Sequence, residues 1–186
     1  MLKSKQTLSA EEISALQKGD TVIFQKLFHN YQPRIYRFLW LKVRSVELAE
    51  DLVQEVFLRL WQARERLDAH RNLEIYIFRI AANLVIDTLR VQKPTTAIDI
   101  AEKSDIADPR NADDKLLHDV LAAEIDRIVS NMPERPQTAF ILSRHQQLSH
   151  KQIAEIMDIS VKTVEKHITS ALKVLRIALR KTESVR

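Results

Sequence analysis

The chain has 186 residues, including one glycine and no cysteine, and a formal net charge of +4. One glycine cannot supply the several positive-φ positions that a phosphate-binding loop, a dinucleotide-binding fingerprint or a set of tight β-hairpins needs, which argues against nucleotide-binding enzyme folds. The absence of cysteine excludes a disulfide framework, thiol catalysis and cysteine-ligated zinc. No segment is apolar over the length of a signal peptide or a membrane span, and we therefore expect a soluble cytoplasmic protein without membrane insertion.

Charge is unevenly distributed along the chain. Residues 33–93 carry eleven Lys and Arg against eight Asp and Glu, and residues 148–186 carry eight against four. Residues 94–114 reverse this balance, with two basic residues against six acidic ones. Two positive segments separated by a negative one suit two contact surfaces on a polyanion such as nucleic acid.

Two capping patterns mark the first helices. Ser9 with Glu12 forms a capping box, which predicts a short first helix. Gly19 followed by Asp20 is typical of a helix end that is followed at once by a new N-cap. A second helix is therefore expected to begin directly after Asp20.

The apolar spacing predicts three further helices in the first half of the chain. Aliphatic and aromatic residues recur every three or four positions through about Val43, and Pro33 is expected to kink this helix. Another helix is expected to begin near Ser45 and a fourth to span residues 73–92.

A segment without sustained periodicity follows these helices. Residues 94–113 are acidic and poor in large apolar side chains, which is typical of a flexible linker. Helical spacing resumes at Leu116, stops at Pro133 and is predicted again over residues 138–146. The sequence thus predicts an all-α protein with two small helical domains, residues 5–93 and 114–182, joined by an acidic linker.

The C-terminal segment has the spacing of a helix-turn-helix. Ser149 with Gln152 forms a capping box for a short helix, and Ser160 opens a longer helix that is expected over residues 161–181. Asp158 stands in the turn, where such motifs usually place glycine. We expect Asp158 to adopt the left-handed conformation there, because aspartate tolerates it better than most residues.

Polar and basic side chains share one face of the last helix, and they have the reach that base edges in the major groove and phosphates require. The alternative is a plain amphipathic hairpin whose charged face is merely solvated. The Ile-Ala, Asp-Ile-Ser and Thr-Val arrangement of the segment favours DNA binding. The residues of this face are Lys162, Thr163, Glu165, Lys166, Thr169 and Ser170.

The segment AEDLVQEVFLRLW, residues 49–61, has two distinct helical faces. One face is aliphatic and is expected to pack in a core. The opposite face combines acidic and amide groups with one leucine, which suggests docking to another protein, although single exposed leucines are common. This second face consists of Asp51, Gln54, Glu55 and Leu58.

Arginines and aromatic residues gather in the stretch that follows. Residues 64–90 contain five arginines together with Tyr76 and Phe78. Such a combination offers phosphate neutralisation and stacking faces to single-stranded or unstacked bases. For Phe78 a core position is favoured, whereas for Tyr76 core packing and base stacking are equally open.

The order of these motifs resembles that of a bacterial sigma factor of the extracytoplasmic-function (ECF) group, within the sigma-70 family. A helix-turn-helix alone is weak support, but four motifs in the family's order make the resemblance specific. The last motif looks most like sigma factors of the iron-uptake regulatory type. The four segments are KGDTVIFQKLFHNYQPRIYRFLW, DLVQEVFLRLW, IFRIAANLVIDTLR and MPERPQTAFILSRHQQLSHKQIAEIMDISVKTVEKHI.

The resemblance implies that residues 5–93 are sigma region 2 and residues 114–182 are region 4, a winged-helix-like helix-turn-helix domain. In this family region 2 binds the β′ clamp helices of RNA polymerase and melts the −10 element, while region 4 contacts the β flap and reads the −35 element. A membrane-bound anti-sigma factor is a further implied partner. The implied polymerase contacts are Asp51, Gln54, Glu55 and Leu58; the implied −10 contacts are Arg71, Asn72, Tyr76, Arg79, Asn83, Asp87 and Arg90; and the implied −35 contacts are the six residues of the last helix.

Several positions depart from the family's pattern. Tyr76 stands where tryptophan is usual, and Ala82 stands where a basic residue is common, which weakens the implied stacking and removes one phosphate contact. Gln147 and Asp158 replace frequent glycines, and Pro136 occupies a site that is often basic. These departures bear on promoter preference more than on the class of protein.

Two other classes of function compete with this interpretation. A helix-turn-helix regulator that acts without replacing a sigma factor would share the last helix, but it would not explain the face of residues 51–58 or the arginines and aromatic residues after it. An enzyme finds little support, because the six histidines have no metal-binding spacing and the carboxylates lie mostly on solvated helix faces. We therefore expect no catalytic residues, no metal and no cofactor.

Overall fold

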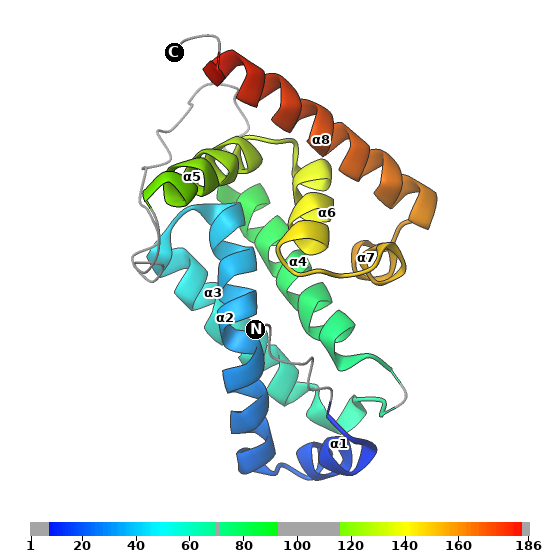
Figure 1. Ribbon diagram of the computed structural model, residues 1–186. Helices are drawn as coiled ribbons and strands as arrows, with labels where there is room; N and C mark the ends of the chain where they lie inside the picture. Colours follow the sequence, from blue (N-terminus) through cyan, green and yellow to red (C-terminus); the bar gives the residue numbers. More distant parts are fainter. Residues whose placement is uncertain (1–7, 70, 93–115, 184–186) are drawn as a thin grey trace.

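The computed structural model describes residues 8–69, 71–92 and 116–183, and every regular element within these residues is helical (Figure 1). The prediction of an all-α protein is confirmed. The predicted linker, residues 94–113, lies outside the described residues. The elements are α1 (Ala10–Gln17), α2 (Thr21–Val43), α3 (Val46–Gln62), the 3₁₀ turn η1 (Arg64–Arg66), α4 (Leu73–Gln92), α5 (Leu116–Ser130), α6 (Glu134–Arg144), α7 (His150–Met157) and α8 (Val161–Glu183).

The first two helices begin at the predicted capping residues. The Ser9 hydroxyl accepts the backbone N–H of Glu12 at 3.2 Å, and the Glu12 carboxylate accepts the backbone N–H of Ser9 at 2.8 Å, which completes the capping box. Gly19 has a φ of +87°, where a side chain would strain the backbone. The Asp20 carboxylate then accepts two backbone N–H groups of α2, at 2.8 and 3.1 Å.

α2 continues as one helix through Pro33, which is exposed near its middle. It ends where Arg44 adopts a left-handed conformation, with a φ of 55°, and donates its backbone N–H to the carbonyl of Trp40 at 2.8 Å. The Ser45 hydroxyl then accepts the backbone N–H of Leu48 at 3.2 Å and caps α3. The predicted start of this helix near Ser45 is therefore confirmed.

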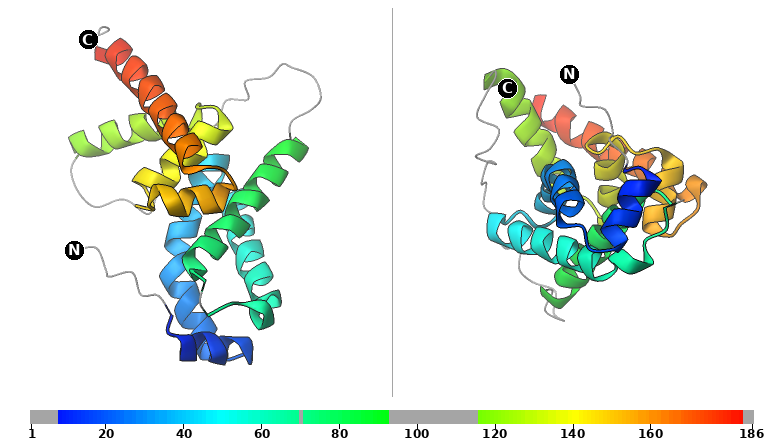
Figure 2. Two further views of the ribbon diagram at one scale, coloured as in Figure 1. Left: turned by 90° about the vertical axis from the view of Figure 1, so that its right-hand side faces the viewer. Right: turned by 90° about the horizontal axis from the view of Figure 1, so that it is seen from below.

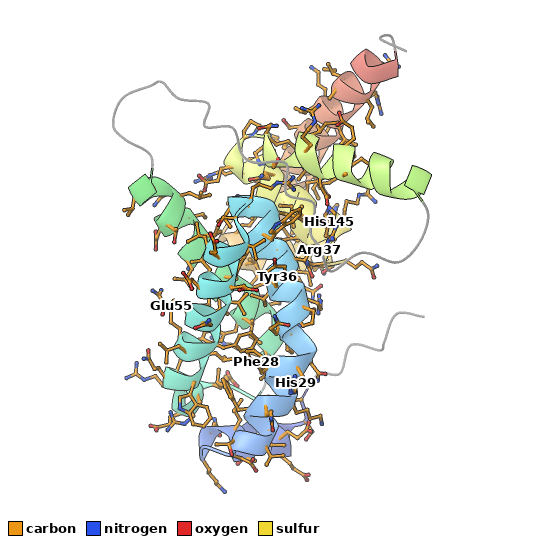
Figure 3. All side chains as sticks on the ribbon, turned by 90° about the vertical axis from the view of Figure 1, so that its left-hand side faces the viewer. Phe28, His29, Tyr36, Arg37, Glu55 and His145 are labelled. Carbon is orange, nitrogen blue, oxygen red and sulfur yellow. The ribbon has the colours of Figure 1, made fainter. Side chains whose placement is uncertain are left out.

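Aromatic side chains fill the space between α2, α3 and α4. Phe38 and Phe78 are fully buried and meet edge to face with their ring centroids 5.8 Å apart, which confirms the predicted core position of Phe78. Phe28 of α2 and Phe57 of α3 have their centroids 4.7 Å apart, and Figure 3 shows Phe28 on the side of α2 that faces α3. These contacts fix the direction of α3 and α4 relative to α2 and decide which of their side chains face solvent.

α6 begins earlier than the sequence predicts. The predicted range is 138–146, whereas α6 spans Glu134–Arg144. The prediction is wrong at its start because Pro136 lies in the first helical turn, where no backbone N–H is needed, so that proline is tolerated there. The prediction is wrong at its end because the chain leaves the helix before Gln147, which adopts a positive φ of 54°.

The C-terminal helices pack against the N-terminal ones. α7 lies against α4, and α5 and α6 contact α2. Figures 1 and 2 show α5–α8 gathered around one end of α2 and α4, with α1 at the opposite end of α2. Within the part of the chain that the structure describes, no helix combines the length and apolarity that crossing a membrane requires.

Candidate nucleic-acid interface

α3 presents the predicted docking face to solvent. Asp51 and Gln54 are exposed, and Glu55 is partly exposed and accepts a hydrogen bond from Arg59 Nε at 2.7 Å. Leu58 leaves 50% of its surface exposed, although the opposite side of the helix is buried in the core. Figure 3 shows Glu55 on the outer side of α3. The face therefore combines one apolar side chain with acidic and amide groups, which is a combination suited to protein contact.

α7 and α8 form the predicted helix-turn-helix. The Ser149 hydroxyl accepts the backbone N–H of Gln152 at 3.3 Å in the capping box that starts α7. Asp158 ends α7 in the left-handed conformation, with φ and ψ both at 52°, as expected for a residue in the usual place of glycine. The Ser160 hydroxyl accepts the backbone N–H of Thr163 at 3.1 Å and opens α8.

The predicted DNA face of α8 is open to solvent. The opposite side of the helix, which includes Val164, Ile168 and Ala171, is buried, and the helix packs on α6 and α7. Thr163 is only partly exposed, and its hydroxyl lies 2.8 Å from that of Ser160. The other five predicted residues, Lys162, Glu165, Lys166, Thr169 and Ser170, are exposed.

Two histidines lie close to this face. His150 Nδ1, at the start of α7, is 3.8 Å from the carboxylate of Glu165, and both side chains are exposed. Burial, and then the charge of Arg135, lowers the pKa of His167 below its usual value. His167 is therefore neutral at physiological pH, and the positive charge of the face comes from its lysines.

A basic cavity lies between the loop that precedes α4 and the first turns of that helix. It measures about 310 Å³, and its lining includes Arg66, Arg71, Arg79 and the side chain of Tyr76. Arg71 is exposed and lies 3.5 Å from the carboxylate of Asp68. Guanidinium groups beside an aromatic ring offer both charge for a phosphate and a face for an unstacked base.

Asn72 and Tyr76 combine structural contacts with access to this cavity. The Asn72 side-chain oxygen accepts the backbone N–H of Glu74 at 3.0 Å and so caps α4, while the side chain stays exposed. Tyr76 is partly buried against the core and lines the cavity. The two alternatives for Tyr76 that the sequence leaves open are therefore compatible in the structure.

The remaining predicted residues of α4 divide between solvent and the C-terminal helices. Asn83, Asp87 and Arg90 are exposed. Arg79 instead donates from Nη2 to the backbone oxygen of Glu155 in α7 at 2.7 Å. A second cavity, of about 480 Å³, separates Arg79, Asn83 and Arg90 from α6 and the end of α7. Within the predicted −10 face, Arg79 is thus bonded to region 4, while Arg71, Asn72, Asn83, Asp87 and Arg90 are exposed.

The acidic and histidine side chains near α5 make contacts between helices. Asp126 of α5 lies 3.2 Å from Arg37 of α2 and 3.8 Å from His145, which follows α6. Figure 3 shows Arg37 and His145 close together at the end of α2. Burial lowers the pKa of His145 and outweighs the opposite effect of Asp126. Among the described residues, no group of three or more histidine, cysteine or acidic side chains is placed to hold a metal ion.

Comparisons with known proteins identify both halves of the chain. The family model described as Sigma-70 region 2 matches residues 27–95, and the one described as Sigma-70, region 4 matches residues 122–175. The ECF RNA polymerase sigma-E factor of Haemophilus influenzae is 30% identical over 172 residues, which cover 88% of this chain and 90% of that protein. The chain belongs to the ECF group of RNA polymerase sigma factors. Region 2 thus corresponds to α2–α4 and region 4 to α5–α8.

Two solved structures have a similar fold. CnrH in complex with the cytosolic domain of CnrY gives a TM-score of 0.72 at 17% identity and covers 93% of this chain and 97% of the matched chain. The sigma factor RpoE of Bartonella quintana in complex with the anti-sigma factor NepR gives 0.71 at 19% identity and covers 84% and 96%. At these identities the likeness concerns the fold.

The family settles the class of function. An ECF sigma factor directs transcription initiation and is not an enzyme, so that the resemblance drawn from the motifs is confirmed at this level. The alternative of a regulator that acts without replacing a sigma factor does not account for the match to region 2.

Sequence reasoning missed the contacts between region 2 and region 4. Helical periodicity indicates which side of a helix is buried, but not which other helix covers it. The residues that join the regions, such as Arg34, Gln146 and Glu155, therefore carried no signal of their own. Lys42 did carry a signal, because it directly follows the apolar run FLWL. In the structure Lys42 is only 1% exposed, and its ammonium donates to the hydroxyl of Thr138 at 2.9 Å.

Proposed function

We propose that three exposed faces divide promoter recognition between them. The α3 face of Asp51, Gln54, Glu55 and Leu58 docks on the β′ clamp helices of core RNA polymerase. Region 2, residues 5–93, also reads the −10 element, and region 4, residues 114–182, contacts the β flap and reads the −35 element. Residues 94–113 link the two regions. The observation that carries the proposal is that one chain holds these three polar faces on separate helices, α3, α4 and α8, with most of their side chains in solvent.

The cavity beside α4 supports a role in holding a base extruded from the −10 element. Extruding a base costs a few kcal/mol, which stacking on an aromatic ring and pairing of the flanking phosphates can offset. Tyr76 supplies the ring, and Arg71 and Arg79 supply positive charge. The proposed −10 contacts are Arg71, Asn72, Tyr76, Arg79, Asn83, Asp87 and Arg90.

The face of α8 supports binding in the major groove of the −35 element. Two lysines serve the phosphates, and Glu165 and the hydroxyl groups are donors and acceptors for base edges. The proposed −35 contacts are Lys162, Thr163, Glu165, Lys166, Thr169 and Ser170.

Polymerase makes the two DNA contacts effective together. Each region alone neutralises few phosphates, so that its binding is weak and sensitive to salt. Once both regions are anchored on the same enzyme, the second contact forms at a high effective concentration. Binding by the anchored protein then depends on the spacing between the two promoter elements as well as on their sequences.

Run-off transcription with core polymerase on a promoter library tests this proposal. The wild-type chain is expected to direct initiation from a set of promoters with two shared elements. Reversal of charge at Asp51→Arg and Glu55→Arg is expected to abolish both initiation and co-purification with core polymerase. The matched control Glu11→Arg with Glu65→Arg makes the same change of charge outside the α3 face and is expected to keep both activities. Unchanged affinity of the first variant for core polymerase would remove α3 as the docking face.

An anti-sigma factor is the further partner that we propose. Both solved neighbours are complexes, one with the cytosolic domain of CnrY and one with the anti-sigma factor NepR. The present chain is proposed to work in the cytoplasm, where polymerase and promoter are, and to be held there by a membrane-bound anti-sigma factor. The residue sequence of its last motif supports an iron-uptake regulatory type. Transcript profiles of a deletion strain under iron limitation test this assignment, which unchanged iron-uptake transcripts would contradict.

A further inference from the structure

Helix α1 lies outside the part of the chain that the region 2 model matches, which begins at residue 27. It has eight residues, too few for an isolated helix to be stable in water. Ile13 and Leu16 are buried, and the helix contacts α2 and the 3₁₀ turn η1. Figure 1 shows α1 beside η1, where the chain leaves α3 and turns towards α4. Packing against its neighbours therefore keeps α1 folded and places it at the start of the loop that leads to α4.

A hydrogen bond joins the last residue of α1 to this loop. The side-chain amide of Gln17 donates from Nε2 to the backbone oxygen of Leu67 at 2.7 Å, and the contact is partly buried. The two residues are 50 positions apart, so the bond is a tertiary contact. Leu67 follows η1 in an extended conformation, and it is only 8% exposed. Because a carbonyl that is removed from water needs a donor, Gln17 holds the backbone of the loop at Leu67.

The loop forms one wall of the cavity that the proposed function assigns to an extruded base. Leu67 lines this cavity of about 310 Å³, and so do its two neighbours in the chain, Arg66 and Asp68. Tyr76, on α4, lines it as well. A shift of the backbone at Leu67 therefore moves one wall of the cavity relative to the ring of Tyr76.

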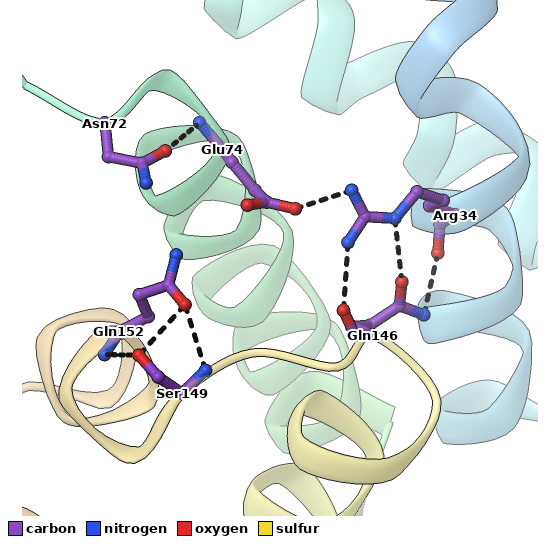
Figure 4. A network of polar contacts seen from close by, with 6 residues as sticks. All are labelled: Arg34, Asn72, Glu74, Gln146, Ser149 and Gln152. Atoms are coloured by element: carbon purple, nitrogen blue, oxygen red, sulfur yellow. Dashed lines mark hydrogen bonds and ion pairs between the residues drawn. The ribbon is translucent and has the colours of Figure 1, made fainter. Parts of the chain in front are cut away.

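The other end of the loop is held by α4 and α2. The Asn72 side-chain oxygen accepts the backbone N–H of Glu74 at 3.0 Å, and the Glu74 carboxylate accepts Arg34 Nη1 at 2.5 Å (Figure 4). These contacts fix the position of Asn72, whereas Gln17 fixes that of Leu67. The two ends of the loop are thus held by different helices, and α1 supplies the support at the end that follows α3.

We propose that Gln17 is a positioning residue for −10 recognition, which sets the width of the base cavity through its hydrogen bond to Leu67. The inference rests on the proposed role of the cavity and adds that α1 determines how well a base fits there. A pocket that is free to widen gains less from the same stacking and polar contacts, because the loop must then be ordered when the base binds. Loss of the Gln17 donor therefore weakens binding of the extruded base and leaves contacts elsewhere on the DNA unchanged.

The test uses full-length variants in complex with core polymerase. Gln17→Met keeps the length of the side chain and the net charge of the protein but removes the donor. Gln17→Lys has a donor of similar reach and serves as the rescue. Gln25→Met makes the same exchange at an exposed position of α2 and is the matched control.

The first measurement is the anisotropy of a labelled single-stranded oligonucleotide that carries the −10 element of a promoter selected by run-off transcription. In a series of derivatives, one base at a time is removed while its sugar and phosphate are kept. The base that enters the cavity is identified as the one whose removal weakens binding less in Tyr76→Ala than in the wild type.

Gln17→Met is expected to bind the intact oligonucleotide ~5-fold more weakly than the wild type and Gln25→Met, which is the order of one hydrogen bond. Once the cavity base is removed, Gln17→Met is expected to bind as tightly as Gln25→Met. Gln17→Lys is expected to recover the wild-type ratio between the affinities for the two oligonucleotides.

Two results would overturn the positioning role. One is equal binding of the intact oligonucleotide by Gln17→Met and Gln25→Met. The other is a loss in Gln17→Met that persists after the cavity base is removed, because such a loss comes from the fold as a whole. If no base meets the criterion set by Tyr76→Ala, the proposed role of the cavity is overturned instead, so the two failures are distinguishable.

The second measurement needs no DNA. Amide hydrogen exchange of residues 65–68 in the free protein is expected to be faster in Gln17→Met than in Gln25→Met, because the backbone of the loop has lost one support. Exchange in α8 is expected to be the same in both variants. Equal exchange at residues 65–68 would show that Gln17 does not hold the loop and contradicts the inference.

Discussion

The two helices that we propose to read promoter DNA differ in what surrounds them. α8 packs one side on α6 and α7 and leaves five of its six predicted contacts in solvent. α4 packs on α2, α3 and α7, and Arg79 is bonded to Glu155. Both helices carry basic and polar side chains along an amphipathic pattern. The accessibility of a DNA-binding helix is therefore decided by the neighbouring domain as well as by its own sequence.

The difference follows from the place of each helix in the fold. α4 lies between the two groups of helices, whereas α8 lies at the outer edge of region 4 (Figure 1). A central helix buries more of its circumference, which leaves a narrower face for a ligand. Ala82 illustrates this, because it is only 3% exposed and lines the cavity between α4 and region 4. A basic side chain, which is common at this family position, would have to displace that packing.

The largest effect on DNA binding is expected at the exposed face of α8. Replacing Lys162 and Lys166 together by glutamate exchanges two attractive phosphate contacts for repulsion, and duplex DNA with the −35 element is expected to bind the free protein less tightly by about 2 kcal/mol, or ~30-fold in Kd. The measurement is an anisotropy titration at low salt, where phosphate contacts count most. The control Lys18→Glu with Lys26→Glu makes the same change of charge just after α1 and on α2. An equal loss in the control would mean that net charge, and not the α8 face, governs binding.

A smaller effect on DNA binding is expected at Tyr76, which lines the cavity beside α4. Tyr76→Ala removes the proposed stacking surface and is expected to weaken binding of the single-stranded −10 oligonucleotide by the polymerase complex by about 1 kcal/mol, the lower end of the range for one stacked base. Tyr76→Trp retains an aromatic face and serves as the control. Unchanged binding of the oligonucleotide by Tyr76→Ala would remove Tyr76 as the stacking surface.

Local signals in the sequence were sufficient for the helices and their caps. Ser9, Asp20, Ser45 and Ser149 each accept the backbone N–H groups that their positions predict, because a cap depends on residues within one helical turn. The start of α6 was missed because proline is both a helix breaker and a good first-turn residue, and spacing alone does not separate these roles.

The exposed faces of α3 and α8 could also be predicted, since amphipathic spacing separates a buried side from a solvated one. The packing of region 4 on region 2 could not be predicted. It depends on Arg34 meeting Gln146, which lie far apart in the sequence, and polar residues give no periodic signal for such a partner.

The smallest expected effect is a loss of stability on mild acidification, which weakens the junction of α2, α5 and α6. Burial lowers the pKa of His145 below its unfolded value near 6.5; Asp126 opposes this shift and Arg37 adds to it. His145 therefore binds its proton less readily in the folded protein, so its contribution to stability is complete above pH 6.5 and is lost as the pH falls through the folded pKa. His167 contributes with the same sign.

The measurement is the thermal unfolding midpoint between pH 7.5 and 5.5, which is expected to fall by a few degrees. The carboxylates whose pKa is lowered, Glu12 and Glu124, titrate below this range and do not contribute to the change. His145→Gln removes the titrating group beside Asp126 and is expected to flatten the dependence. If the variant loses as much stability on acidification as the wild type, another group carries the effect, and the junction of α2, α5 and α6 does not respond to pH.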